Sequence, residues 1–209
     1  MDLRFLPVLV LGFCLSSSAP THEECETMVT PKSLEDPSPL FHRWTFVMGF
    51  ANHSVYQNML TTTQSSWTRL SQLADHKEIA MHQSNKMNEK CFHSQTNVTI
   101  EGNTAKIELV NVTSELQVIP THCDKCVALK VHSEAKHLNN VLHFLNYTFT
   151  APDVFQNEAF YLMSTESMVE EADLDYFKKQ AACLGFHGEP DFVYDPKNSF
   201  CEENEGLHI

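Results

Sequence analysis

The sequence predicts an all-β protein, an antiparallel meander that closes as a barrel or a sandwich, with one α-helix near the C-terminus. Large apolar side chains alternate with smaller or polar ones along successive short segments, a pattern typical of half-buried strands. Nearly all of these segments are separated by short polar turns, and no long helix lies between them, which argues against a parallel α/β sheet. With 209 residues, the chain has the size of one domain.

The N-terminus is typical of a secretory signal peptide. Residues 5–15 form an apolar run that is too short to span a bilayer, and the small residues 16–19 follow it. We expect cleavage after Ser18, which makes residues 1–18 the signal peptide and residues 19–209 one domain. Because no later segment is apolar enough to span a membrane, we expect a secreted protein of plasma or mucus.

The strands are expected in the body of the chain. Residues 20–41 contain four prolines and little periodicity, so an irregular segment is predicted ahead of the first strand. That strand is predicted at residues 44–50, where large side chains at Trp44, Phe46 and Met48 alternate with smaller ones. Further strands are predicted at residues 62–74, 77–85, 91–101, 104–112, 115–120, 126–132, 141–150 and 158–164.

One helix is predicted at about residues 168–184. Ser167 and Glu170 have the spacing of a capping box, and Gly185 provides a left-handed stop. Between these signals apolar residues recur at helical intervals, namely Leu174, Phe177, Ala181 and Leu184. The apolar face needs a partner, and we expect the helix to pack on the outside of the barrel.

Disulfides are predicted from the cysteine count. Removal of Cys14 with the signal peptide leaves six cysteines, and an even number in an oxidising compartment indicates three bridges. The residues alone leave the pairing open, although the short spacing of Cys123 and Cys126 favours a local loop. A metal or redox site is the alternative for that pair, but no second pair follows at a fitting distance. The acidic tail, residues 188–209, is then tied down only through Cys201.

The charge of the chain excludes one class of partner. Fourteen basic and 27 acidic residues give a formal net charge of −13. Such a surface repels phosphate backbones, so we expect no nucleic-acid partner. The same charge favours cationic guests by long-range attraction, although it can also serve solubility alone.

Catalysis is not expected. The sequence has no nucleophile elbow, no glycine-rich phosphate loop, no HExxH motif and no two-CxxC zinc pattern. All six mature cysteines are better used in bridges than as a nucleophile. We therefore expect no enzyme activity, no cofactor and no metal site.

N-glycosylation is predicted at four asparagines, each of which begins an Asn-X-Ser/Thr sequon: Asn52, Asn97, Asn111 and Asn146. Each must face solvent if it carries a glycan. These sequons support the secretory interpretation independently of the signal peptide.

The sequons also predict which face of a strand points inward. If Asn146 points outward, the opposite parity of residues 141–150 faces the interior: Val141, His143, Leu145, Tyr147 and Phe149. The same reasoning at Asn97 sends Val98 and Ile100 inward. Asn111 shares its parity with apolar residues, so we expect it at the strand end or in the following turn.

Several features together resemble the lipocalin family. They are His42-Arg43-Trp44 ahead of an alternating strand, Tyr56, the long run of strands, and one C-terminal helix that ends at Cys183. The stretch from Leu174 to Cys201, with Val-Tyr between its cysteines, is similar to the alpha-1-acid glycoprotein (orosomucoid) group. Fish members of that group bind saxitoxin, tetrodotoxin or tributyltin.

This resemblance implies an eight-stranded antiparallel up-and-down barrel that holds one small ligand, with one C-terminal α-helix packed outside. It also implies disulfides from Cys25 to Cys183 and from Cys91 to Cys201, which leaves Cys123 with Cys126 as an addition. A second departure from the family is His42, which stands where a glycine usually precedes the tryptophan.

The resemblance further implies a set of cavity residues, for each of which ordinary barrel packing is the alternative. They are Phe46, Tyr56, Gln83, Asn85, Leu145, Tyr147, Tyr161 and Met163. Strand parity adds Met48 and His143, and a soft cation such as an organotin can use an imidazole as a ligand.

We therefore expect a secreted, monomeric glycoprotein carrier that sequesters a small hydrophobic or cationic organic molecule, such as a toxin, an organotin or a drug-like compound, inside its barrel. The alternative function is that of an acute-phase or immunomodulatory plasma glycoprotein that acts through its surface and glycans.

Overall fold

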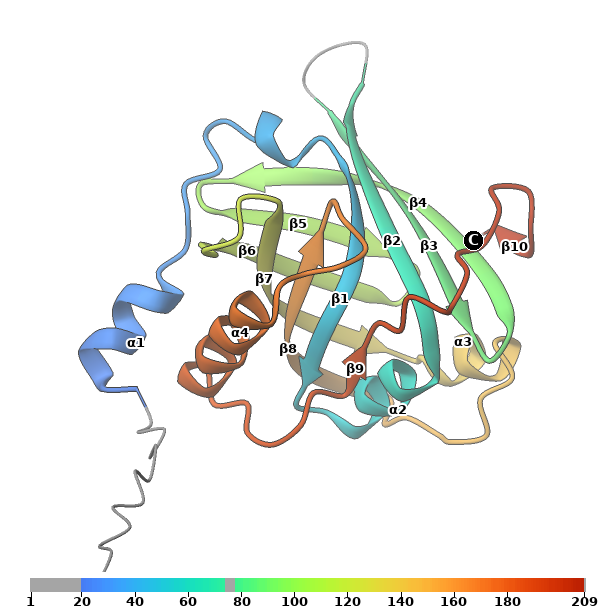
Figure 1. Cartoon of the computed structure of the whole chain (residues 1–209). Coiled ribbons are helices and arrows are strands. Elements are labelled where there is room, and N and C mark those ends of the chain that lie inside the picture. The colour runs from blue at the N-terminus through green and yellow to red at the C-terminus, as the bar shows by residue number, and fades with distance from the viewer. Residues whose placement is uncertain (1–19, 74–77, 209) are drawn as a thin grey trace, which may run out of the picture.

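Eight antiparallel strands follow one another around a closed barrel in the computed structural model, which describes residues 20–73 and 78–208 (Figure 1). Each strand pairs with the next one in the chain, and β8 pairs with β1 to close the ring. The strands are β1 (Arg43–Ala51), β2 (Thr63–Gln72), β3 (Ile79–Met87), β4 (Lys90–Glu101), β5 (Thr104–Leu109), β6 (Val112–Ile119), β7 (Cys126–Lys136) and β8 (Val154–Ser164). The predicted eight-stranded up-and-down barrel is confirmed.

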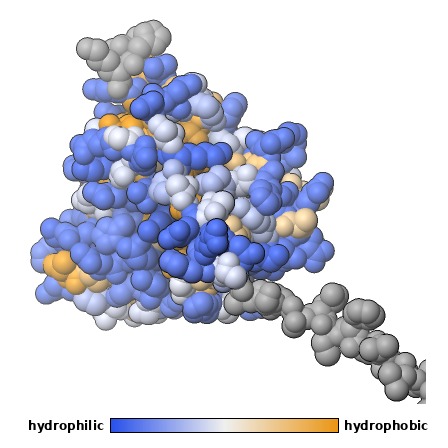
Figure 2. Space-filling view, turned by 90° about the vertical axis from the view of Figure 1, so that its left-hand side faces the viewer, coloured by the Kyte–Doolittle hydropathy of each residue, from blue (hydrophilic) through white to orange (hydrophobic). Residues whose placement is uncertain are grey.

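Two of the expectations from the sequence concern residues outside the described part of the chain. The predicted signal peptide, residues 1–18, lies outside the described residues, as do Ala74 and Lys77, the expected end of one strand and start of the next. Among the described residues, no helix is both long enough and apolar enough to cross a membrane. The face of the molecule seen in Figure 2 is largely hydrophilic, with hydrophobic residues gathered only in small patches.

The segment between β7 and β8 is helical where a strand was expected. Residues 141–150 contain most of helix α3 (Asn139–Phe144) and the turn after it, whereas β7 and β8 both extend beyond their predicted bounds. Buried leucines recur here at helical spacing, namely Leu138, Leu142 and Leu145. The Asn139 side chain fixes the return of the chain, because it bonds the backbone N–H and carbonyl of Ala151 at 2.7 and 2.8 Å.

Strand β1 contains a β-bulge that reverses the direction of its side chains. The pairing of β1 with β8 shifts register between Phe46 and Met48, so Val47 is an extra residue in the ladder. Phe46 lies in the cluster inside the barrel, whereas Val47 and Met48 both lie in the cluster on its outer face. The expectation that Met48 lines the cavity is therefore wrong.

Gly49 leaves room for the ring of Phe46. A Cβ atom at Gly49 would overlap Cζ of Phe46, closer than two non-bonded carbon atoms can approach. The Phe46 ring stacks on Phe192 with centroids 4.4 Å apart and meets Tyr161 edge-on at 5.1 Å. The glycine thus permits the packing that fixes Phe46 at the inner wall.

The chain ahead of β1 closes one end of the barrel. A single 3₁₀ turn, η1 (Ser38–Leu40), lies there, and Nε1 of Trp44 donates to the carbonyl of Leu40 at 2.9 Å. His42 packs edge-on to Trp44, with ring centroids 5.9 Å apart. The tryptophan is buried beside His42, so the departure from glycine at this position leaves the closed end packed.

The N-terminal segment is more regular than expected. Residues 20–41 contain helix α1 (His22–Val29), which begins with a capping box between Thr21 and Glu24. The Thr21 hydroxyl accepts from the Glu24 N–H at 3.3 Å, and the Glu24 carboxylate accepts from the Thr21 N–H at 2.7 Å. The proline content suggested an irregular segment, but the prolines lie outside this helix.

Helix α4 (Glu171–Cys183) is the predicted C-terminal helix, but its start differs. Glu170 is the N-cap and its side chain makes no capping hydrogen bond, so the predicted capping box with Ser167 is wrong. The preceding chain is held elsewhere, because the Thr165 N–H donates to the carbonyl of Lys125 at 2.9 Å. Ser167 is thereby kept outside the helix.

Helix α4 packs on the outer face of the barrel, as expected (Figure 1). Phe177 is 1% exposed and stacks on Phe160 of β8, with centroids 4.5 Å apart. The stop predicted at Gly185 is confirmed, since this residue has a φ of +88° just after the helix.

Three disulfides join the expected pairs: Cys25 with Cys183, Cys91 with Cys201, and Cys123 with Cys126. The first ties α1 to the end of α4. The second ties the C-terminal tail to the start of β4.

The acidic tail, residues 188–209, has more attachments than Cys201 alone. Strand β9 (Phe192–Val193) pairs with β1, and β10 (Leu207–His208) pairs in parallel with β4. The Asp191 carboxylate accepts from the Ala51 N–H at 2.8 Å. The expectation of a tail held through one disulfide is therefore wrong.

A cluster of aromatic and basic side chains lies on the outer face beneath this tail. The guanidinium of Arg43 lies 4.5 Å from the ring centroid of Trp67, and His82 meets the same ring edge-on at 5.0 Å. His93 is buried, and its ring stacks on His208 of β10 at 4.8 Å. The tail thus lies against basic groups that are close to one another and stacks on the buried His93.

The free energy of unfolding is expected to decrease as the pH falls below about 6.5. Burial lowers the pKa of His82 from its ordinary value, and the positive charges of His93, Arg69 and His208 lower it further, while Glu203 opposes them. The unfolded chain therefore takes up the proton first, and the stability present above the unfolded pKa is lost as the pH falls through the folded pKa.

Urea unfolding measured between about pH 7.5 and pH 5 checks this dependence on His82. A His82→Gln variant is expected to show a shallower loss of stability over that window. An identical slope in both proteins would contradict the assignment to His82.

Candidate functional site

The barrel encloses a cavity of about 710 Å³. Every barrel strand contributes side chains to its wall, because alternate residues of a strand point to the same face. On β4, for example, Val98 and Ile100 line the cavity while Asn97 is exposed, as predicted from the sequon. The cavity therefore replaces the solid core that a smaller or more tightly packed barrel has.

The end of the barrel opposite η1 contains helix α2 (Ser54–Thr62), helix α3 and the turn between β5 and β6. The His53 side chain caps α2, since its Nδ1 accepts from the Val55 N–H at 3.2 Å. Val110 in the β5–β6 turn lines the cavity and is 79% exposed, so the cavity reaches the surface here. This end is the mouth.

The α3 segment covers part of the mouth. Val141 and Leu145 of this segment line the cavity. Tyr147 connects it to the facing elements, because its hydroxyl shares a hydrogen bond of 2.9 Å with the Thr62 hydroxyl and donates to Sδ of Met87 at 3.6 Å. Access to the cavity therefore depends on the position of this segment.

The cavity wall is apolar and carries no charged side chain among the described residues. Its polar groups are the hydroxyls and amides of Tyr56, Thr63, Ser66, Thr68, Gln83, Asn85, Ser94, Asn111, Ser114, Ser133, Asn140 and Tyr161. Trp44 adds an indole N–H, which donates to the carbonyl of Leu40, and all remaining lining side chains are hydrocarbon or thioether groups.

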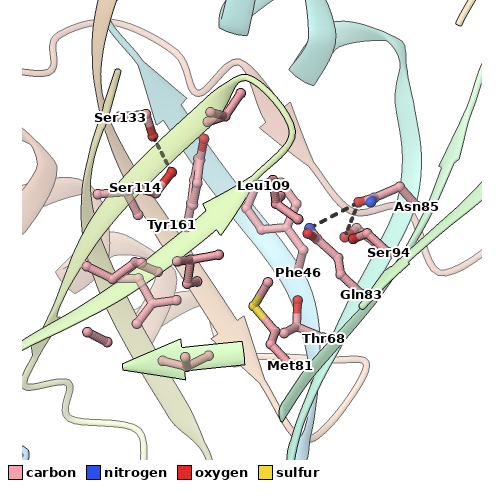
Figure 3. Close-up of a pocket in the computed structure, with 18 of the residues that line it drawn as sticks. Phe46, Thr68, Met81, Gln83, Asn85, Ser94, Leu109, Ser114, Ser133 and Tyr161 are labelled. Atoms are coloured by element: carbon pink, nitrogen blue, oxygen red, sulfur yellow. Dashed lines mark hydrogen bonds between the residues drawn. The ribbon is translucent and has the colours of Figure 1, made fainter. Parts of the chain in front are cut away.

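One group of polar side chains, which we call the amide cluster, consists of Ser66, Gln83 and Asn85 on β2 and β3. Oδ1 of Asn85 accepts from the Ser66 hydroxyl at 2.7 Å and from Nε2 of Gln83 at 3.3 Å. These bonds fix both amides against the wall (Figure 3).

A second group, the hydroxyl cluster, consists of Tyr56, Ser114 and Ser133 on α2, β6 and β7. The two serine hydroxyls share a hydrogen bond of 2.8 Å. Burial raises the pKa of Tyr56, and its interaction with the Ser133 hydroxyl offsets only part of this shift. Burial raises the pKa of the deeper Tyr161 as well. Both phenols are therefore neutral at physiological pH.

Seven of the ten predicted ligand-binding residues line the cavity: Phe46, Tyr56, Gln83, Asn85, Leu145, Tyr161 and Met163. Tyr147 lies beside it and holds the α3 segment. Met48 faces α4 because of the bulge. His143 is exposed in the last turn of α3, so the expectation that it points inward is wrong, because the segment is helical and has no strand parity.

The hydroxyl cluster includes two residues that the sequence reasoning missed. Ser114 has the parity of Leu116 on β6, and Ser133 has the parity of Val131 on β7. Extending the inward parity of these apolar neighbours would have identified both serines.

The four sequon asparagines are all exposed. Asn111 lies in the turn between β5 and β6 with a φ of +66°, which confirms its expected place. Asn146 follows α3 with a φ of +60°, so strand parity cannot be taken from it.

Comparisons with known proteins identify the fold. No protein-family model matches the sequence, and no curated protein matches it. The solution structure of lipocalin 12 from rat epididymis matches with a TM-score of 0.58 and 11% identity, over 85% of this chain and 94% of that one.

Two siderocalin structures match at similar levels. Siderocalin Ex-FABP, described as functioning through dual ligand specificities, has a TM-score of 0.55 and 13% identity over 75% of this chain and 95% of its own. A siderocalin described with a dual ligand binding mode has a TM-score of 0.57 and 15% identity over 82% of this chain and 98% of its own. At these identities the likeness shows the lipocalin fold, while the narrower resemblance to alpha-1-acid glycoprotein and the fish toxin-binding proteins stays a prediction.

Proposed function

We propose that this chain with a lipocalin fold is a carrier that binds one small, largely apolar molecule inside its barrel. The observation that carries the proposal is the cavity of about 710 Å³, whose size falls within the range of small-molecule sites, about 300–1,000 Å³. Its wall supplies apolar area for affinity and a few fixed polar groups for orientation. The ligand binding described for the two siderocalins supports a binding role for this fold.

The cavity favours a neutral guest over a cation. A guanidinium toxin or an organotin cation would lose hydration on entry, and the described wall offers no carboxylate to replace it. His143, the imidazole considered for an organotin, lies on the surface. The net charge of −13 resides outside the cavity wall, where it serves solubility and long-range attraction.

We infer further that the chain is exported and glycosylated. The three disulfides and the exposure of all four sequon asparagines support this inference. The glycans would also serve the alternative function, an acute-phase or immunomodulatory protein that acts through its surface. The enclosed cavity favours the carrier. Protein interiors are normally close-packed, and a function of the surface alone does not require a cavity inside the barrel.

Titration with N-phenyl-1-naphthylamine, a neutral apolar fluorophore, tests the carrier. The mature, disulfide-bonded chain is expected to raise the emission of the probe and to saturate at one equivalent. Emission that rises without saturation, or does not rise, would overturn the proposed function.

A further inference from the structure

We propose that the natural guest is a neutral single-chain amphiphile whose head group carries two hydroxyls, and that the amide cluster and the hydroxyl cluster hold this head group from opposite walls. This inference rests on the proposed carrier function and names the class of its ligand. The structure supports it through the positions of the clusters, their unused hydrogen-bonding atoms and the apolar wall below them.

The two clusters face each other. Ser66, Gln83 and Asn85 belong to β2 and β3, whereas Ser114 and Ser133 belong to β6 and β7. In a barrel of eight strands in chain order, strands four places apart lie on opposite sides. Figure 3 shows the Ser114–Ser133 pair and the Gln83–Asn85 pair on opposite sides of the cavity.

Both clusters lie near the mouth. Asn85 is close to the end of β3 at Met87, Ser114 follows the start of β6 at Val112, and Ser133 precedes the end of β7. All three strand ends lie on the side of the barrel that carries α2 and α3. The clusters thus form a polar level at similar depth, just inside the entrance.

Thr68 pairs with Gln83 and belongs to this polar level, and the wall between it and the closed end is apolar except for the indole N–H of Trp44, which donates to the carbonyl of Leu40. It includes Ile79, Met81, Val98, Ile100, Leu116, Val118, Val127 and Leu129. An apolar chain inserted toward η1 would contact these side chains and would leave its polar end at the level of the two clusters.

The amide cluster has a donor group and an acceptor atom that make no internal hydrogen bond and are left for a ligand. Its internal bonds use Oδ1 of Asn85 and Nε2 of Gln83. No hydrogen bond of the described side chains uses Nδ2 of Asn85 or Oε1 of Gln83, and both residues line the cavity. A ligand hydroxyl matches this pair, because it can accept from Nδ2 of Asn85 and donate to Oε1 of Gln83.

The hydroxyl cluster has a similar capacity. Its three hydroxyls have three donors, and the bond between Ser114 and Ser133 uses one of them. Two donors and several lone pairs remain for a guest. The Tyr56 phenol and both serines are neutral, so a charged head group would find no counter-ion here.

The width of the barrel sets the spacing of the two ligand groups. Eight strands about 4.8 Å apart and tilted by about 40° give a backbone diameter of about 16 Å. Short side chains and hydrogen bonds on both walls take up most of this width, which leaves a separation of only a few ångströms between the ligand oxygens. Adjacent hydroxyls of a glycerol head group meet that requirement, whereas a single hydroxyl reaches only one wall.

The test compares 1-O-dodecylglycerol with 1-dodecanol, which share an apolar chain and differ in the head group. Displacement of N-phenyl-1-naphthylamine is expected to give about tenfold or greater preference for the glycerol ether, from a net gain of one or two hydrogen bonds. Dodecanoate, whose charge has no partner in the wall, is expected to bind more weakly than the glycerol ether.

Variants assign the preference to the two clusters. Asn85→Leu, and Ser114→Ala combined with Ser133→Ala, are each expected to reduce the preference at least threefold. Ser71→Ala, which removes an exposed serine hydroxyl of β2 outside the cavity wall, is the matched control and should keep it. Near-ultraviolet circular dichroism establishes that each variant is folded.

The outcomes separate this inference from the proposed function. Saturable binding of the fluorophore with equal affinities for the ether and the alcohol would overturn the inference and leave the carrier in place. A preference that survives both cluster variants would also overturn it. If the fluorophore fails to bind, both proposals fall.

Discussion

Replacement of Leu116 by glutamate is expected to weaken binding of the neutral fluorophore at least about 100-fold at neutral pH. Leu116 lines the cavity from β6, and the described wall carries no basic side chain that could pair with a new carboxylate. In the empty barrel the new carboxylate stays hydrated. A neutral guest must displace that water, and the desolvation of the charge lowers the magnitude of the binding free energy by several kcal/mol.

The neighbouring residue provides the control for Leu116→Glu. Gln117 follows it on β6 and lies on the opposite, outer face, beside Glu158 and Lys130. Gln117→Glu makes the same change of charge there and should leave the affinity within about twofold. Affinity of Leu116→Glu is expected to recover as the pH is lowered toward about 5, because protonation removes the buried charge. Equal affinities of the two variants at neutral pH would contradict binding inside the barrel.

Replacement of Phe177 by alanine is expected to lower the free energy of unfolding by about 3–5 kcal/mol. This side chain is the largest buried one on α4, and its ring stacks on Phe160 and lies near Phe50. Its loss leaves a void between the helix and the outer face that the rigid barrel cannot collapse to fill.

Urea unfolding followed by circular dichroism measures this effect. Lys178→Ala, on the exposed side of the same helix, is the control and should change stability by less than about 0.5 kcal/mol. Because Phe177 is absent from the described cavity wall, its folded variant should retain affinity for the fluorophore. A loss below about 1 kcal/mol would show that α4 is not anchored through this ring.

Much of the barrel was predictable because strand formation follows from local alternation. Seven predicted strands overlap with the observed β1 to β7, and the last one overlaps with β8. The exposed Asn97 correctly placed Val98 and Ile100 on the inner wall. Gly185 correctly marked the end of α4, since a left-handed residue terminates a helix regardless of its surroundings.

Two errors in the predicted site have a common cause. The predicted inward direction of Met48 depended on uninterrupted parity through β1, and one extra residue at Val47 reversed it. The prediction for His143 depended on a strand that is helical in the structure. In that segment apolar residues at odd positions coexist with buried leucines at helical spacing, and a short run permits both interpretations.

The sequence by itself determined the fold class, the number of disulfides and the identity of most inward-facing side chains. These properties depend on residue type and on spacing over a few positions, which the chain carries locally. Only the tertiary structure decided that the amide cluster faces the hydroxyl cluster, that Tyr147 holds the α3 segment at the mouth, and that the tail lies against the outer basic cluster. Each of these contacts joins residues far apart in the chain, and their geometry is fixed by barrel closure, a bulge and helix packing, none of which leaves a signature in a short stretch of sequence.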